Sequence, residues 1–435
     1  MFSIRRSLVV VVALGVLAAS IIATRAGRKH LTHSELTAAV AANSPASPAD
    51  ARIQKAQALI QMSQREAEGY NLLASAYLQK ARETGDLSFN TKAQAALQSV
   101  FAIEPQNYDV LKLQAKLLLS NHRFKDALEV CKRAQLSRQD DADVYGAITD
   151  ANVELGNYAE AVAAAQKMVD LRPDTSAYSR IAYLRSLHGD TVGAIKAMRV
   201  AVRAADPGDR EAMAWCRVQL GNELLNAGRR DEAEREYDQA LLIFPGHRLA
   251  SEAKARSRAA AGDLNTALAI YNEQQAKSPS ADVALALGDL YTQLGRTEEA
   301  KRNYDVFEVL ERQNVELEKS WRHLIYYWLD PDKNLTEALT QARMEREQRK
   351  DVFTCDLLAW ALFKNGDMPA AKAAMKETLR LGTKDARISY HAGMIFSASR
   401  SQSAAKKYLK QAAGNPALDV RQATIASQTL AKLRN

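Results

Sequence analysis

The sequence predicts an all-α solenoid of about ten stacked helical hairpins. Three observations carry this prediction. An alanine recurs along the chain at a nearly constant spacing, a glycine precedes six of these alanines by five residues, and a proline follows four of them by twelve residues. Self-similarity at a period of about 34 residues is typical of helical hairpins that bury a continuous core by stacking.

The recurring alanine sets the period. Its successive separations are 34, 34, 33, 39, 34, 33, 38, 33 and 34 residues, so seven of the nine lie within one residue of 34. A small side chain lets the second helix of a hairpin approach the first, and an apolar residue four positions later lies on the same helical face. The alanines are Ala93, Ala127, Ala161, Ala194, Ala233, Ala267, Ala300, Ala338, Ala371 and Ala405.

Glycine and proline mark where the helices turn and stop. A chain that reverses within a few residues needs a position with φ > 0, which glycine takes without a Cβ penalty. Proline ends the second helix because it cannot continue the hydrogen-bond ladder. The spacings of 39 and 38 predict longer connections near 207–213 and 308–318, and about seven extra residues are expected between the helices of the first hairpin, around Ala81–Asn90. The glycines are Gly156, Gly189, Gly228, Gly262, Gly295 and Gly366, and the prolines are Pro105, Pro173, Pro245 and Pro279.

Residues 220–245, LGNELLNAGRRDEAEREYDQALLIFP, resemble a near-consensus tetratricopeptide repeat, and residues 285–304 are nearly as close. The resemblance covers residues 67–417, although the first, second, eighth and tenth repeats are degenerate. It implies a right-handed superhelical solenoid of about ten such hairpins, whose concave surface binds a partner. The family pattern of Leu-Gly, Gly, Ala, aromatic, Ala and Pro falls on Leu220, Gly221, Gly228, Ala233, Tyr237, Ala240 and Pro245.

Four segments are expected along the chain. Residues 1–30 form a signal or membrane-anchor segment, and residues 31–50 form a flexible linker rich in small residues. Residues 51–417 form the solenoid. Residues 418–435 form a C-terminal capping helix, because an open array needs a polar outer face at its end.

The N-terminal segment predicts a location at the cell envelope. Ser7–Ala23 is a run of 17 uncharged, largely apolar residues between basic flanks, and as a helix it spans ~26 Å, just short of a ~30 Å hydrocarbon core. This length is slightly long for a signal-peptide core and slightly short for a membrane span. An inner-membrane anchor facing the periplasm and a cleaved signal on an exported periplasmic or secreted protein both stay open. A buried helix of a cytosolic protein is the less favoured alternative.

The distribution of charge argues against a nucleic-acid partner. Five of the eight net positive charges lie in residues 1–30, so the array itself is close to neutral. A phosphate backbone would require several Lys or Arg side chains in a row. The positions that line the concave surface in tetratricopeptide proteins carry mixed signs here: Asp109, Lys112, Lys116, Asp150, Glu154, Glu252, Arg256, Asp282, Asp289, Asp356, Lys364 and Arg387.

No residue pattern predicts catalysis, a metal ion or a cofactor. The three cysteines, Cys131, Cys216 and Cys355, are widely spaced and form no CxxC pair, which argues against a disulfide framework and a zinc site. Cys131 and Cys355 fall on core positions of the repeat and are expected to be buried. The seven histidines show no metal-ligand spacing and are expected to be ordinary helix and turn residues. Gly-rich phosphate loops and GxSxG turns are absent.

Aromatic residues gather at the concave positions of the last three repeats. The family resemblance places six residues there, and clustered aromatic side chains are typical of binding hot spots. The alternative is that some of them pack between helices, because the run Trp321–Asp330 is apolar nearly all round. Alanine at Trp360 or Tyr327 should then lower stability instead of partner binding. The predicted partner-binding residues are His323, Tyr327, Phe353, Trp360, Phe363 and Tyr390.

The function predicted is non-catalytic binding. The chain is expected to be a scaffold or adaptor at the cell envelope that holds a peptide or protein partner in its concave groove, attached to the membrane through residues 1–30 if these are retained. Two alternatives stay open: a tethering or regulatory subunit of a separate envelope enzyme, and a helical-repeat RNA-binding protein, which the mixed charges oppose. The sequence specifies neither the partner nor the oligomeric state.

Overall fold

The computed structural model describes residues 48–318 and 320–433. The predicted signal or anchor segment, residues 1–30, and residues 31–47 of the predicted linker lie outside this range. In the described part of the chain, no helix combines the length and the apolar character needed to cross a membrane.

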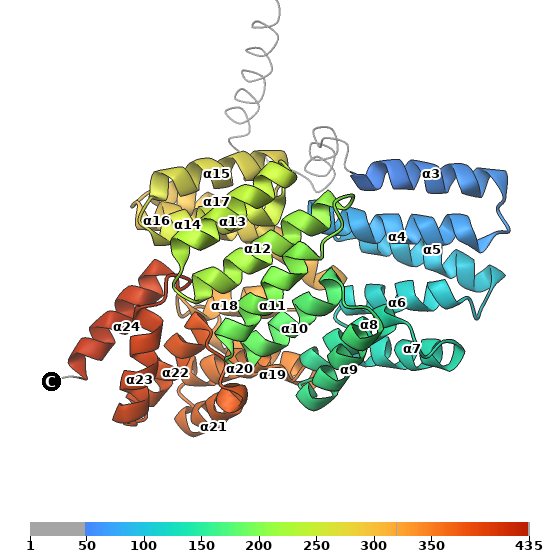
Figure 1. Ribbon diagram of the computed structural model, residues 1–435. Coiled ribbons are helices and arrows are strands. Elements are labelled where there is room, and N and C mark those ends of the chain that lie inside the picture. The colour runs from blue at the N-terminus through green and yellow to red at the C-terminus, as the bar shows by residue number, and fades with distance from the viewer. Residues whose placement is uncertain (1–47, 319, 434–435) are drawn as a thin grey trace, which may run out of the picture. The chain divides into compact units, whose positions relative to one another are not determined.

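The described residues form 22 α-helices and no strand (Figure 1). Ten hairpins follow one another, which confirms the predicted all-α solenoid. Their first helices are α4 (Ala67–Thr84), α6 (Tyr108–Ser120), α8 (Ala142–Glu154), α10 (Thr175–Leu187), α12 (Arg210–Asn226), α14 (Arg248–Ala260), α16 (Ala281–Gln293), α18 (Arg322–Leu329), α20 (Val352–Lys364) and α22 (Ala386–Ala398). Their second helices are α5 (Ser88–Ile103), α7 (Phe124–Ser137), α9 (Tyr158–Leu171), α11 (Thr191–Arg203), α13 (Arg230–Ile243), α15 (Leu264–Lys277), α17 (Thr297–Glu318), α19 (Leu335–Gln348), α21 (Met368–Thr378) and α23 (Gln402–Ala413).

One further helix flanks the hairpins at each end of the described range. The helix α3 (Pro48–Met62) packs on α4, and α24 (Val420–Lys432) packs on α23. A short 3₁₀ turn, Leu379–Leu381, follows α21. Most side chains of α3 and α24 are exposed or half-buried, and α24 occupies the stretch for which a capping helix is predicted.

The recurring alanine occupies the same place in every hairpin. All ten alanines lie on second helices, and none is more than 4% exposed. In the near-consensus repeat of residues 220–245, the first helix also carries a small residue where it meets the second helix. A Cβ added to Gly221 of α12 would lie only 2.3 Å from Cε1 of Tyr237, because the tyrosine ring of α13 packs directly on the glycine backbone. The close approach of the two helices thus has the physical basis that the sequence pattern predicts.

The turn within each hairpin contains a residue with positive φ. Glycine provides it in seven hairpins. In the second and tenth hairpins, His122 (φ 55°) and Arg400 (φ 57°) take the position, and in the eighth Asp332 and Asn334 do so. The degenerate repeats therefore keep the geometry of the turn although the sequence lacks the glycine.

The prediction of a longer connection at 308–318 is wrong. These residues continue α17, which is 22 residues long, because no glycine or proline interrupts them and the buried Phe307 and Val315 keep a helical spacing. At 207–213 the extra residues are divided between a loop and the first turn of α12. In the first hairpin they lengthen α4 to Thr84, so the connection to α5 is short.

The last hairpins pack against earlier ones. The chain meets itself again after 189 to 196 residues, through hydrogen bonds that involve Ser278, Val352, Thr383 and Asn415. One core cluster contains Tyr158 and Leu187 of the third and fourth hairpins together with Val352 and Ile388 of the ninth and tenth. In Figure 1 the orange helix α20 accordingly lies near the green helix α10, with which it shares this cluster. We call this junction between the earlier and later hairpins the seam.

Candidate partner-binding site

Three of the six predicted binding residues form one buried aromatic cluster. The ring of Trp360 lies 5.1 Å from that of Phe363 and 5.7 Å from that of Tyr390, measured between centroids. Trp360 is only 3% exposed, and Tyr390 is also buried. The indole and phenol rings therefore contribute to the core between α20 and α22, and Phe363 at the cluster's edge is half-buried.

Of the other three predicted residues, Tyr327 packs against the same core cluster and lies one helical turn from His323 on α18. Tyr327 is half-buried against the ring of Phe307, 4.8 Å away. Phe353 is half-buried in the core cluster shared across the seam. The imidazole of His323 is exposed, and its Nδ1 lies 3.2 Å from Oε1 of Glu311. That all six bind a partner stays a prediction.

The ring of Trp360 packs against a buried histidine, His391. The His391 imidazole stacks on the indole with 4.2 Å between centroids, and its Nδ1 lies 2.8 Å from Oδ2 of Asp356. Tyr326 donates its hydroxyl to the same carboxylate oxygen at 3.2 Å. Asp356 is a predicted groove position, yet it is buried. A pair spaced 35 residues apart carries no local sequence signal, which is why His391 is expected from sequence to be an ordinary helix residue.

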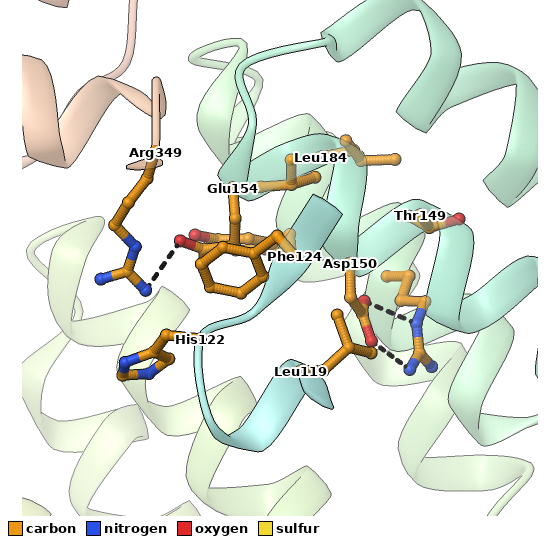
Figure 2. Close-up of a pocket in the computed structure, with 11 residues that line it drawn as sticks. Leu119, His122, Phe124, Thr149, Asp150, Glu154, Leu184 and Arg349 are labelled. Atoms are coloured by element: carbon orange, nitrogen blue, oxygen red, sulfur yellow. Dashed lines mark hydrogen bonds and ion pairs between the residues drawn. The ribbon is translucent and has the colours of Figure 1, made fainter. Parts of the chain in front are cut away.

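The structure shows a cavity at the ends of the first helices of hairpins two to four (Figure 2). Its volume is about 240 Å³. Two predicted concave positions, Asp150 and Glu154, contribute to it, and Arg349 reaches it from the loop after α19 (Figure 2). The cavity is lined by Leu119, His122, Phe124, Thr149, Asp150, Val153, Glu154, Arg180, Tyr183, Leu184 and Arg349.

The charged groups of the cavity are paired with one another. Arg180 donates from Nε and Nη2 to the two carboxylate oxygens of Asp150, at 2.8 and 2.6 Å. Arg349 is 5% exposed, and its Nη2 lies 3.1 Å from Oε2 of Glu154. Because two arginines and two acids balance, the cavity does not select strongly for a charged ligand.

Three uncharged polar side chains, those of His122, Thr149 and Tyr183, and several apolar side chains complete the lining. Burial lowers the pKa of His122 to about 3, with Arg349 and Arg322 adding to the effect, so the imidazole is neutral at physiological pH. Its Nδ1 has no hydrogen-bond partner among the described residues. Tyr183 is 42% exposed although it is a large aromatic residue. Partial desolvation by the neighbouring helices and the charges of Glu154 and Asp351 raise its pKa above the usual value, so the phenol remains protonated. The cavity can therefore hold a side chain that combines an apolar body with a hydrogen-bonding end.

Asp289 and His323, on first helices outside the cavity, are among the side chains with shifted pKa values. Asp289 is exposed, yet partial desolvation by the surrounding helices and the charges of Asp419 and Asp330 raise its pKa to about 7, although the Tyr304 hydroxyl donates to it at 2.8 Å. Partial desolvation by the surrounding helices would lower the pKa of His323, but its hydrogen bond to Glu311 and the charge of Asp282 raise it to about 9.

The described residues hold no group of three or more His, Cys, Asp or Glu side chains placed to bind a metal ion. The predicted burial of Cys131 and Cys355 is confirmed, and Cys216 is buried as well. Burial raises the pKa of Cys131 and of Cys216 to about 12, so their thiols are unreactive in the folded chain.

Sequence models described as tetratricopeptide repeat match most of the array. They match residues 90–151, residues 149–210, 218–282 and 357–419, and residues 281–305. The chain belongs to the tetratricopeptide repeat family. Tetratricopeptide repeat arrays are scaffolds for protein–protein interaction and are typically non-catalytic. The matched ranges leave out the hairpin α18–α19, whose turn lacks glycine.

Several solved structures of tetratricopeptide repeat proteins are similar to this chain. Cut9 in the APC/C hetero-tetramer Cut9-Hcn1 is 16% identical with a TM-score of 0.45, and the match covers 85% of this chain and 63% of that one. Yeast Tom70 is 12% identical with a TM-score of 0.38 over 88% and 92%. The type IV pilus biogenesis factor PilW is 15% identical with a TM-score of 0.40 over 49% and 97%. A search of curated proteins finds no match.

Proposed function

We propose that this tetratricopeptide repeat chain is a scaffold at the cell envelope that holds a peptide segment of a partner protein in the cavity of Figure 2. The observation that carries the proposal is the convergence of first-helix side chains from three successive hairpins on one cavity that is accessible to solvent. First-helix positions line the concave surface in this family, so a peptide laid along the array passes the cavity.

The chemistry of the lining favours a peptide as the ligand. Tyr183 offers a large, partly exposed aromatic ring, and Leu119, Val153 and Leu184 offer apolar surface beside it. Tyrosine is enriched among the residues that dominate binding energy at protein interfaces. The ion pairs of Arg180 and Arg349 hold the walls in place before a ligand arrives, which reduces the ordering cost of binding.

The location at the envelope and the absence of nucleic acid among the partners are parts of the same proposal. Ser7–Ala23 supports the location, and the paired charges of the cavity support a protein partner over a phosphate backbone. Fractionation of cells with an alkaline carbonate wash tests the location. A retained anchor keeps the protein in the membrane pellet, and a cleaved signal releases it. Recovery of the full-length chain in the cytosolic fraction would contradict an envelope location.

Affinity capture from detergent-solubilised envelopes, followed by mass spectrometry, tests the binding function. The full chain, the variant Tyr183→Ala and the control Val192→Ala are compared. Val192 is 65% exposed on α11 and does not line the cavity. We expect Tyr183→Ala to lose the captured protein at least tenfold while the control retains it, because aromatic hot-spot residues contribute ~2 kcal/mol or more.

Three other outcomes are informative. Capture of the same protein by Tyr183→Ala would show that the cavity is not the binding site. Co-purification of a catalytic activity would favour the alternative function as a subunit that tethers an envelope enzyme. Nuclease-sensitive capture would favour the RNA-binding alternative and overturn the proposal.

A further inference from the structure

The seam repeats one contact several times in a constant register. The backbone carbonyl near the end of a first helix accepts a hydrogen bond from the loop that follows a hairpin five positions later. Thr84 accepts from Ser278 at 3.3 Å, Glu154 from the backbone N–H of Lys350 at 2.9 Å, and Asn226 from the Asn415 amide at 3.2 Å. Leu187 accepts from the Thr383 hydroxyl in the same way. The last carbonyls of a helix have no partner within the helix, so these bonds satisfy exposed acceptors.

Two arginines of the later hairpins reinforce the seam. Arg349 pairs with Glu154 and lies 4.9 Å from the ring centroid of Phe124. Arg380 lies 5.2 Å from the ring centroid of Tyr158, whose hydroxyl accepts a hydrogen bond from the Val352 N–H at 2.9 Å. These contacts cross between hairpins that are far apart in the sequence, and they link the second and third hairpins to the eighth and ninth.

Glycine turns allow the two sides to approach closely. A Cβ on Gly156 would lie 2.5 Å from the carbonyl oxygen of Lys350, and a Cβ on Gly189 would lie 2.4 Å from that of Gly382. Equivalent glycines outside the seam have free space. At Gly295 and Gly366 no atom lies within 4 Å of an added Cβ, although their φ values are also positive. A side chain at Gly156 or Gly189 would therefore separate the two sides of the seam.

The seam combines polar contacts at loops with one apolar cluster. Hydrogen bonds, ion pairs and cation–π contacts surround a buried cluster that includes Tyr158, Leu187, Val352 and Ile388. Successive hairpins, in contrast, bury continuous rows of apolar side chains. A region that has fewer buried apolar contacts and more solvent-exposed hydrogen bonds than its surroundings opens at a lower free energy than they do.

We propose that the seam is a latch that opens while the hairpins on both sides remain folded. Its position gives the latch a role in binding, because Arg349 is both a seam residue and a wall of the cavity in Figure 2. Opening removes that wall and gives a peptide access from the side. A ligand that contacts both Tyr183 and Arg349 binds the closed state and holds the latch shut. This second part rests on the proposed function, whereas the latch itself does not.

Cys355 is a natural reporter of the latch. Its thiol is buried against two residues that form the later side of the seam, with Sγ 3.7 Å from the carbonyl oxygen of Lys350 and 3.5 Å from Nη1 of Arg380. Cys131 and Cys216 are buried in other core clusters and provide internal controls. Alkylation by N-ethylmaleimide, resolved by mass spectrometry at each cysteine of the full chain, measures local opening at all three positions in one experiment.

We expect Cys355 to react faster than Cys216 in the native protein. Gly156→Ala should increase the rate at Cys355 by about tenfold and leave Cys216 unchanged, because the added methyl overpacks the seam. Gly295→Ala is the matched control, since it introduces the same backbone strain at φ 71° without a seam contact. Its ratio of Cys355 to Cys216 reactivity should equal that of the native chain.

Thr383→Val provides a second, milder test, because it removes only the hydrogen bond to Leu187. It should raise the reactivity of Cys355 by several-fold. If the three cysteines react at one common rate in every variant, the seam opens only on global unfolding and the latch is disproved. If Cys355 responds as expected while Tyr183→Ala still captures its partner, the latch stands and the proposed binding cavity fails.

Discussion

Trp360 and His391 stack face to face in the core between the ninth and tenth hairpins. Their ring centroids are 4.2 Å apart, and their planes differ by only 14°. Both side chains are buried. At the edge of the imidazole ring, Nδ1 lies 2.8 Å from Oδ2 of Asp356. A residue that the repeat pattern places on the concave surface is thus part of the packing that holds two hairpins together.

Trp360→Ala should destabilise the protein by about 3–5 kcal/mol, the usual cost of removing a buried indole. Urea unfolding followed by circular dichroism measures this change. The exposed control Val192→Ala should change the free energy of unfolding by less than about 0.5 kcal/mol. Stability near that of the native chain, together with loss of a partner, would return Trp360 to the binding surface.

Gly221→Ala should cost about 1–3 kcal/mol, because its Cβ would lie 2.3 Å from Cε1 of the buried Tyr237 and the ring has no room to move. Gly414→Ala is the control. Its Cβ would lie 3.6 Å from the nearest atom, the carbonyl oxygen of Lys410, so its effect should be small. Thermal and urea unfolding of the two variants measure the difference. Equal stability of both variants would show that the helices of the fifth hairpin are not closely packed at Gly221.

Arg400→Gly should stabilise the protein by about 0.5–1 kcal/mol. Arg400 has φ 57° in an exposed turn, and a left-handed backbone costs a side chain ~1–2 kcal/mol, part of which glycine loses again through its greater freedom in the unfolded chain. Arg400→Ala keeps the Cβ and should give no such gain. The midpoint of urea unfolding compares the three proteins, and a destabilised glycine variant would mean that Arg400 makes a stabilising contact that outweighs the strain.

Asp289→Asn should remove a pH dependence of stability between about pH 4 and pH 7. Partial desolvation by the surrounding helices and the charges of Asp419 and Asp330 raise the folded-state pKa of Asp289 to about 7, although the side chain is exposed. The unfolded value is ~3.9. The folded state therefore binds more protons in this range. The stability that protonation provides is present below the unfolded pKa and is lost as the pH rises through 7.

The unfolding midpoints at pH 5 and pH 8 check this prediction. The native chain should lose more stability than Asp289→Asn over that interval. Identical pH profiles for the two proteins would mean that Asp289 titrates normally in the folded state.

The local features of the fold could be predicted because each depends on residues near in the sequence. The recurring alanine and the residue four positions later, such as Ala233 and Tyr237, lie on one helix face and select the partner helix of the same hairpin. The turn glycines, such as Gly228, are needed for a left-handed backbone that few other residues adopt. The 308–318 segment was misassigned because a spacing reveals that residues are inserted, but not whether they extend a helix or a loop.

The candidate site was only partly predictable. Asp150 and Glu154 were expected on the concave surface from their repeat positions, and both line the cavity. Arg349 and His122 carry no motif, and they meet there only because loops far apart in the sequence come together. A similar limit applies to Trp360, because periodicity assigns a residue to a face of its helix without showing which later helix covers that face.

The sequence by itself determined the all-α repeat, its period and the packing within each hairpin, because these follow from contacts between residues less than about 34 positions apart. Tertiary structure alone decided the seam and the cavity beside it. Each hairpin adds a small rotation to the stack, and the accumulated rotation, which no single repeat encodes, brings Glu154 to Lys350 and Arg349.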